Sequence, residues 1–296
     1  MAPLIVPERF SPRFAGGFDR WYLRGLVARS WHSVRLAEQG AELLDELGRH
    51  VGPAIVLMNH QSWWDPLVGL WIHGRFEPTR RAIGPMEATQ LAKFGFFKRL
   101  GVFGIEPDAP GAIDAMTAHV SERFIQHPKT TLWLTPQGTF ADVRTPIRLR
   151  PGAAAIAARA LPLDTAAAAA GEPHGGLLVL SVAMEYAFWL DRKPELLLRA
   201  ARISAPTDEA GVRPTTGAWN RAMTAVMHAN AAALAALVVA RDPAALRCVG
   251  GKGARNANNS RVWDWWLRLR GGSGRIDPTN RDRPPARPAT TDGTTQ

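Results

Sequence analysis

The sequence predicts an α/β fold, in which a mixed and largely buried sheet is flanked by helices. Three observations support this class. Hydrophobic residues make up 46% of the 296 residues, which is enough for a full core. Short and wholly apolar runs, typical of buried strands, recur along the chain. Segments with the apolar spacing of helices alternate with these runs, as expected for an α/β protein.

The first predicted element is a helix over residues 18–47, where apolar side chains recur at near-helical spacing among several arginines. Gly25 and Gly40 interrupt this pattern. A basic amphipathic helix that carries tryptophan can lie on a membrane surface. It can equally pack on the domain with a solvated arginine face, and the sequence leaves both alternatives open.

The remaining elements follow from apolar runs and helical periodicity. Strands are predicted at 54–58, 131–135, 177–184 and 196–203. Helices are predicted at 87–100, 112–126, 152–161 and 219–240, with another beginning within 67–72. The uncharged stretch 222–240 is long enough to span a membrane. Its alanine-rich composition is only weakly hydrophobic, which predicts a buried helix of a soluble domain instead.

Composition divides the chain into three parts. Residues 1–49 combine a proline-containing lead-in with the basic helix, and residues 50–249 hold the alternating strands and helices. Residues 250–296 read as a flexible linker, a tryptophan-rich segment at 261–270 and a disordered tail.

Charge and cysteine content limit the partners and the compartment. Lys and Arg number 36 against 26 Asp and Glu, a formal net charge of +10 that suits nucleic acid, anionic lipid or a phosphorylated ligand. Cys248 is the one cysteine, which excludes a disulfide framework and predicts a reducing compartment. The first twenty residues lack the apolar region of a signal peptide, so we expect a cytoplasmic protein.

The most informative segment runs from residue 58 to 66 and begins at the end of a predicted strand, the edge where ligands bind in open α/β sheets. His60 and Asp65 in it can face each other. A carboxylate bonded to one ring nitrogen orients the imidazole, and the other nitrogen can then accept a proton from an alcohol. The alternative is that the two residues only cap a helix. Trp63 and Trp64 are predicted to pack in the core more readily than to line a groove.

These residues, and others in order along the chain, resemble the phospholipid/glycerol acyltransferase family. Asn59-His60-x4-Asp65 matches its first motif, and residues 134–139 resemble its third. Weaker likenesses occur at 96–103, 150–154 and 180–183, so that the resemblance covers about residues 50–205. The Pro-Gln-Gly at 136–138 and Glu-Tyr-x-Phe-Trp at 185–189 are similar to a divergent subset, which we associate loosely with bacterial pigment or glycolipid acylation.

The resemblance implies a glycerolipid-acyltransferase-like fold in residues 50–249 and direct acyl transfer from acyl-CoA or acyl carrier protein to a lipid hydroxyl. It implies that His60 is the general base and that Asp65 orients it. The substrate-binding residues would be Asn59, Gln137, Gly138, Thr139 and Arg150. No cofactor and no metal are expected. The protein would be peripheral, on an anionic membrane surface at the inner face of the cell membrane.

Three departures from the family pattern bear on the acceptor. Pro107 stands where the second motif carries Arg, Gln137 where the third carries Glu, and Phe140 where the third carries Arg. The resemblance implies that the family arginines bind the phosphate of the acceptor. The absence of these arginines here predicts an acceptor without a phosphate, such as a glycolipid or carotenoid glycoside. Other basic residues either replace them or form a solvated or membrane-facing surface: Lys98, Arg99, Arg144, Arg148 and Arg150. The alternative is an ordinary lysophosphatidate (1-acyl-glycerol-3-phosphate) acyltransferase.

A different class, a non-catalytic protein that binds nucleic acid or anionic lipid, would also suit the positive charge. The aromatic residues lie mainly within apolar segments and do not alternate with basic residues on a sheet face, so no nucleic acid partner is expected. The chain has no Gly-x-Ser-x-Gly elbow and no phosphate-binding loop of the Gly-x4-Gly-Lys type. Its histidines show no paired metal spacing.

Overall fold

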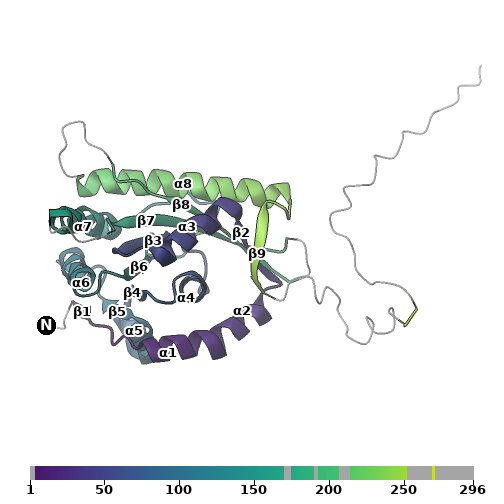
Figure 1. Cartoon of the computed structure of the whole chain (residues 1–296), viewed down its shortest axis with the longest axis horizontal. Coiled ribbons are helices and arrows are strands. Elements are labelled where there is room, and N and C mark those ends of the chain that lie inside the picture. The colour runs from purple at the N-terminus through teal and green to yellow at the C-terminus, as the bar shows by residue number, and fades with distance from the viewer. Residues whose placement is uncertain (1–3, 170–174, 190–192, 207–213, 252–268, 271–296) are drawn as a thin grey trace, which may run out of the picture.

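The computed structural model describes residues 4–169, 175–189, 193–206, 214–251 and 269–270. Within these residues the strands form one mixed sheet in the order β1-β5-β4-β6-β3-β7-β8-β2-β9 (Figure 1). The strands are β1 Ile5–Val6, β2 Ser33–Ala37, β3 Ala54–Met58, β4 Arg81–Glu87, β5 Val102–Ile105, β6 Thr130–Leu134, β7 Leu178–Ala187, β8 Glu195–Arg202 and β9 Leu246–Gly251. The predicted α/β class with a mixed sheet is confirmed.

The centre of the sheet is parallel, and the antiparallel pairs lie toward its two ends. Strands β5, β4, β6, β3 and β7 run in one direction, whereas β1 opposes β5 and β8 opposes β7. Leu57 lies opposite Leu134 and Met58 opposite Val182, so the carboxyl ends of β3, β6 and β7 meet at one edge. We call it the carboxyl edge, and it is where ligands bind in sheets of this kind.

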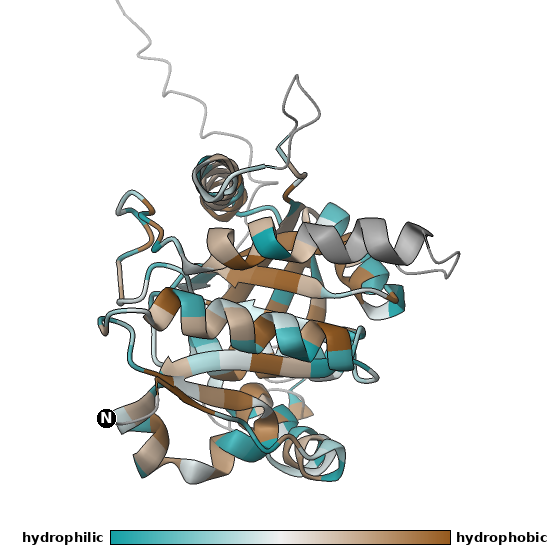
Figure 2. Cartoon of the chain, turned by 90° about the vertical axis from the view of Figure 1, so that its left-hand side faces the viewer, coloured by the Kyte–Doolittle hydropathy of each residue, from teal (hydrophilic) through white to brown (hydrophobic). Residues whose placement is uncertain are grey.

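Helices cover both faces of the sheet (Figure 1). One face carries α3 Glu38–Arg49, α4 Asp65–Phe76 and α5 Ala88–Lys93, and the other carries α6 Ala112–Gln126, α7 Gly152–Ala169 and α8 Thr216–Ala240. The segment α1 Pro12–Gly17, the π-helix η1 Phe18–Leu23 and α2 Arg24–Ser30 also lies on the first face, with the 3₁₀ helix η2 Gly95–Leu100 beside it. Hydrophobic residues concentrate on the strands between these layers (Figure 2).

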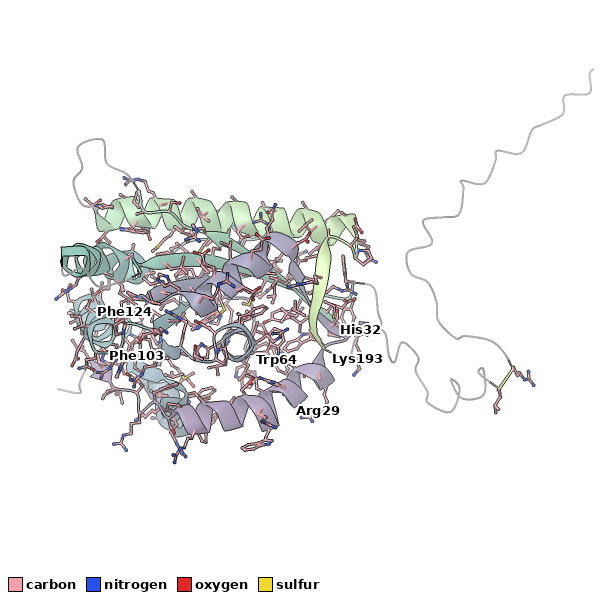
Figure 3. The ribbon with its side chains drawn as sticks, viewed as in Figure 1. Arg29, His32, Trp64, Phe103, Phe124 and Lys193 are labelled. Atoms are coloured by element: carbon pink, nitrogen blue, oxygen red, sulfur yellow. The ribbon has the colours of Figure 1, made fainter. Side chains whose placement is uncertain are left out.

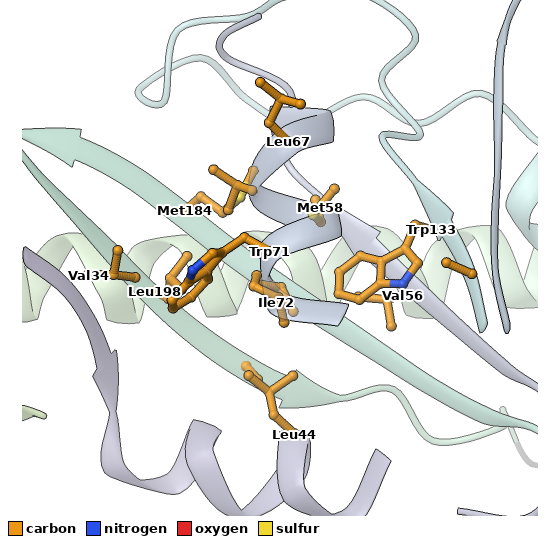
Figure 4. Packing of buried hydrophobic residues seen from close by; sticks show 14 of the residues in the cluster. Val34, Leu44, Val56, Met58, Leu67, Trp71, Ile72, Trp133, Met184 and Leu198 are labelled. Carbon is orange, nitrogen blue, oxygen red and sulfur yellow. The ribbon is translucent and has the colours of Figure 1, made fainter. Parts of the chain in front are cut away.

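The wholly apolar run of β3 is explained by its position between two helix layers. Val56 and Met58 pack with α4 side chains such as Trp71 and Ile72 (Figure 4). Ile55 and the other alternate residues of β3 point into the second core, which is lined by α6, α7 and α8. Because both faces of this strand are buried, its sequence does not alternate between apolar and polar residues.

Two predicted helices are wrong in part. The predicted helix 18–47 contains η1, α2, strand β2 and most of α3. Within β2, Val34 and Leu36 are fully buried while the strand pairs with β8 and β9, so sheet pairing overrides the helical periodicity. The predicted helix 87–100 divides into α5 and η2 after β4 ends at Glu87.

Strands β1 and β2, from the segment 1–49, lie in the same sheet as the strands of residues 50–249. The tryptophan-rich segment and the tail lie almost wholly outside the described residues.

Helix α8 is less buried than the sequence predicts. Among the described helices it alone has the length and apolar composition that a membrane span requires, a property that core helices share. It lies along the sheet and buries one stripe, which includes Met223, Met227 and Leu234. Asn230 in this stripe donates to the carbonyls of Ser181 (3.1 Å) and Arg199 (3.0 Å). Only 28% of its most apolar window is buried, so most of the helix surface faces outward.

The N-terminal segment is held to α6 by a buried ionic cluster with a predicted pH dependence. Burial alone would raise the pKa of Glu8, but the hydrogen bond and charge from His119 and the charge of Arg123 lower it to about 2. Because this carboxyl has an ordinary pKa of 4.5 when unfolded, its stabilising effect is complete above that pH and is lost as pH falls toward about 2. We expect urea unfolding to show a loss of about 2–3 kcal/mol across this range. Glu8→Gln should be less stable at neutral pH and should lose less on acidification, and an unchanged slope would contradict the assignment.

Candidate active site

His60 and Asp65 come together at the carboxyl edge. His60 lies two residues beyond the end of β3, and Asp65 is the first residue of α4. Their side chains are joined between His60 Nδ1 and Asp65 Oδ2 at 2.8 Å. The Asp65 side chain is fully buried, whereas the His60 side chain is 17% exposed. Since Nδ1 is occupied, Nε2 is the ring nitrogen that can exchange a proton with another molecule.

The spacing of five residues has a local cause. Asp65 Oδ2 also accepts hydrogen bonds from the backbone N–H groups of Gln61 (2.7 Å) and Ser62 (2.9 Å). The carboxylate therefore closes the turn that precedes α4, and it supplies the partners that a buried charge needs. Of the two alternatives that the sequence leaves open, the side chain orients the histidine; it does not cap α4, because the N–H groups that it accepts from precede the helix.

Tyr186 of β7 completes the surroundings of Asp65. Its hydroxyl donates to Asp65 Oδ1 at 2.8 Å, and its ring stacks on Trp31 with centroids 5.9 Å apart. Trp31 in turn meets Trp64 edge-on, and Trp64 is labelled in Figure 3. Burial and the adjacent Asp65 carboxylate raise the pKa of Tyr186, so its hydroxyl stays protonated and acts as a donor. Sequence reasoning missed this contact, although Tyr186 belongs to the Glu-Tyr-x-Phe-Trp segment.

Asn59 and Gln137, both predicted to bind substrate, have their side chains bonded to backbone groups. Asn59 Nδ2 donates to the Met184 carbonyl (3.0 Å), and the Met184 N–H donates to Asn59 Oδ1 (2.8 Å). Gln137 Oε1 accepts from the backbone N–H of His60 at 2.6 Å. The geometry supports a different role for them, in which they fix the His60 turn between β6 and β7.

The loop after β6 lies against the exposed side of His60. The Phe140 ring has its centroid 4.4 Å from that of His60 and is 58% exposed. Gly138 has φ +69°, in the left-handed region that favours glycine, and its N–H donates to the Thr135 carbonyl. This N–H is therefore already used within the loop and is not free to bond to a substrate oxygen. Thr139 is exposed.

Arg150 joins the second and third motif segments. A side chain on Gly138 would lie 2.7 Å from Arg150 Nε, so the guanidinium passes directly over this glycine. Arg150 Nη1 bonds to Asp108 Oδ1 at 2.9 Å, next to Pro107. The Arg150 side chain is 50% exposed, so it remains accessible to a ligand as well as paired.

Two of the basic residues considered as phosphate ligands are misplaced for that role. Lys98 and Arg99 precede the amino end of β5, which runs parallel to β4, β6 and β3, so they lie at the edge opposite His60. The Arg99 guanidinium covers the Phe14 ring at 4.1 Å. Arg144 pairs with Asp142 at 2.7 Å in an exposed position.

The Trp63 side chain is 63% exposed, so the prediction that it packs in the core is wrong.

A carboxylate-oriented histidine that is partly open at the carboxyl edge of an α/β sheet is the arrangement expected of an enzyme that takes a proton from a bound substrate. The model of the Acyltransferase family matches residues 37–185, half of the chain, and this region includes the His60 turn, the Gln137 loop and most of β7. The chain therefore belongs to the phospholipid/glycerol acyltransferase family and is an acyltransferase. No match is found among curated proteins.

Proposed function

We propose that this enzyme transfers a fatty acyl group from acyl-CoA or acyl carrier protein to a hydroxyl of a lipid-like acceptor, with His60 as the general base. The observation that carries the proposal is the 2.8 Å contact between a partly exposed imidazole and the buried Asp65 carboxylate. The exposed rings of Trp63 and Phe140, on the same turn and across from it, offer apolar surface to lipid substrates.

The reaction follows from this geometry in two stages. His60 Nε2 takes the proton of the acceptor hydroxyl as its oxygen bonds to the thioester carbonyl carbon. The carbon–sulfur bond then breaks, the thiolate leaves, and it takes the proton from the imidazolium. The buried Asp65 stabilises the imidazolium between these stages. The products are one ester and one free thiol, and no covalent enzyme intermediate is needed.

The proposal is tested by supplying the purified protein with long-chain acyl-CoA or acyl carrier protein and a panel of lipid alcohols. We expect ester, identified by mass spectrometry, and free thiol to appear in equal amounts only when an acceptor is present. Thiol release without ester would show a thioesterase instead. An absence of both with every donor and acceptor would contradict the proposal.

The acceptor we propose carries no phosphate at the position where relatives hold one, as in a glycolipid or carotenoid glycoside. Phe140 occupies the surface beside His60, and Arg150 has Asp108 as a neighbour that would repel a phosphate. Wild-type kcat/KM is expected to favour such an acceptor over lysophosphatidate by about 10²-fold, because two charge-assisted phosphate contacts are missing.

Phe140→Arg is expected to raise kcat/KM for lysophosphatidate by about tenfold or more, since one arginine–phosphate contact is restored. A competition assay with both acceptors measures the change. The matched control is Phe188→Arg, which adds the same charge at another exposed phenylalanine. Efficient turnover of lysophosphatidate by the wild-type enzyme would instead favour the ordinary lysophosphatidate acyltransferase.

We also propose that the enzyme attaches peripherally to an anionic membrane at the cytoplasmic side. Aromatic side chains of η1 and η2 and the residues around them form an exposed cluster, in which Phe18 lies 5.1 Å from Tyr22 and 6.1 Å from Phe96 between centroids. Trp21 beside them is 81% exposed. Exposed basic residues belong to the same run of helical segments, and together with the rings they form what we call the aromatic–basic face: Arg13, Arg20, Arg24, Lys93 and Arg99. Exposed rings within a basic border suit an interface with anionic lipid.

The double substitution Trp21→Ser and Phe96→Ser is expected to weaken binding to vesicles rich in phosphatidylglycerol by about tenfold or more, from lost apolar burial. Co-sedimentation measures it, with phosphatidylcholine vesicles expected to bind less in all cases. Val239→Ser, at an exposed apolar residue of α8, is the control. Equal binding by the double variant and wild type would place the membrane contact elsewhere.

A further inference from the structure

Within the segment 185–189, which follows the fourth motif, the Tyr186 hydroxyl donates a hydrogen bond to the Asp65 carboxylate. The two oxygens of the Asp65 carboxylate have different partners: Oδ2 accepts from the His60 ring and two backbone amides, whereas Oδ1 accepts from the Tyr186 hydroxyl. We propose that Tyr186 is a positioning residue, which sets the proton affinity of the His60 imidazole through its hydrogen bond to Asp65. The inference rests on the proposed role of His60 as the base.

The Tyr186 hydroxyl is held rigidly enough for this role. Its ring is stacked on the buried Trp31 at an interplanar angle of 16°, and Tyr186 pairs with Leu196 in the β7–β8 ladder. The preceding residue but one, Met184, is bonded at its backbone to Asn59 and to Gln61 Nε2. The strand that carries Tyr186 is thus hydrogen-bonded to the residues directly before and after His60 in its turn.

The sign of the effect follows from electrostatics. An O–H donor stabilises the Asp65 carboxylate and draws on its negative charge, so less of that charge acts on the imidazolium. Without the hydroxyl, the carboxylate would hold the imidazolium more strongly, and more of His60 would be protonated at neutral pH. A protonated imidazole cannot accept the proton of the acceptor. The Tyr186 hydrogen bond therefore favours the form of the imidazole that can accept a proton.

Few other charges bear on Asp65 in the described part of the chain. His60 and Tyr186 are the titratable side chains bonded to it, from the β3–α4 turn and from β7. On α4 itself, His73 lies two turns away and is bonded to Glu77. Glu185 is next to Tyr186 on β7, but alternate strand residues face opposite sides, and its neighbours are Asp142 and Arg144. The segment from α2 to β2 contributes the uncharged ring of Trp31.

Tyr186→Phe keeps the ring and removes only the hydroxyl. We expect the acid limb of the kcat/KM profile to move to higher pH by about 0.5–1 unit, so that kcat/KM on that limb falls by about three- to tenfold. The titration of the His60 ring nitrogens, followed by NMR and assigned with His60→Gln, should move in the same direction. Thr224→Val also removes one hydroxyl, from α8 on the other face of the sheet, and it is a control that should change neither measurement. The chain has one other tyrosine, Tyr22.

The two tyrosines also permit a change of opposite sign. In the Tyr22→Phe protein, 3-fluorotyrosine supplied during expression enters at position 186 alone. Its hydroxyl is a stronger donor, so the acid limb and the His60 titration should move to lower pH. This substitution keeps the ring and the hydrogen bond, so it tests the inference even if Tyr186→Phe fails to fold.

The inference is overturned if the pH profile and the His60 titration are the same in wild type, Tyr186→Phe and the fluorinated protein. It is also overturned if Tyr186→Phe lowers activity equally at every pH with no change in the His60 titration, which is the behaviour of a purely structural residue. Failure of the proposed function looks different, since His60→Ala would then remain active. The NMR titration reports on Tyr186 in that case as well.

Discussion

Replacing His60 with alanine is expected to lower the rate of acyl transfer by about 10²- to 10⁴-fold, the usual contribution of a general base. The imidazole is 17% exposed and contacts Asp65 and the Phe140 ring, so its removal takes away the base and little of the core. Thiol release with donor and acceptor both saturating measures kcat, and thermal unfolding checks that the fold is retained.

Asp65→Asn is expected to reduce kcat by a similar factor for a different reason. The asparagine keeps the size of the side chain, but it cannot stabilise an imidazolium and it places an amide N–H₂ where Asp65 now accepts hydrogen bonds. His127→Ala is the control, because this exposed histidine lies at the edge of the sheet opposite His60. Full activity in both His60→Ala and Asp65→Asn would remove the pair from the mechanism.

The sequence identifies strands that are buried on both faces, because such strands are composed of apolar residues at nearly every position. β3 is apolar at every position because helices cover both its faces, so its bounds are predicted correctly. β4 contains Gly84 and Pro85, and β5 has only four residues, so neither stands out from a loop. The alternation in β2 is too short to outweigh the helical spacing on either side of it.

The candidate site divides in the same way between local and distant contacts. The His60–Asp65 pair lies within one turn, and a spacing of five residues is enough to suggest it. Asn59 and Gln137, which the sequence predicts to bind substrate, are bonded to the backbone of Met184 and of His60, distant partners that only the arrangement of the strands brings close. Tyr186 is 121 residues from Asp65. Besides its place in the Glu-Tyr-x-Phe-Trp segment, its sequence signal is its alternation with Val182 and Met184 on β7, which puts all three on the face of α4.

At the amino edge of the sheet, a second polar cluster serves stability. Glu77 at the end of α4 is fully buried and accepts from the His73 ring (2.9 Å) and the Trp133 indole (3.1 Å). Arg80, also fully buried at its side chain, pairs with Glu77 at 3.1 Å. Its guanidinium also donates to three backbone carbonyls, those of His50 after α3, Gly52 before β3 and Thr130 at the start of β6.

Arg80→Met is expected to lower the free energy of unfolding by about 3–5 kcal/mol, because the buried Glu77 carboxylate and several carbonyls lose their charged partner. Urea unfolding at neutral pH measures the change. The double variant Arg80→Met with Glu77→Leu should recover part of the loss, since an apolar replacement of a whole buried pair removes the unpaired charge. Arg202→Met, which breaks an exposed pair with Glu46, should cost no more than about 1 kcal/mol. If the Arg80 variant were as stable as the Arg202 variant, or the double variant no better than Arg80→Met, the carboxylate would not depend on Arg80.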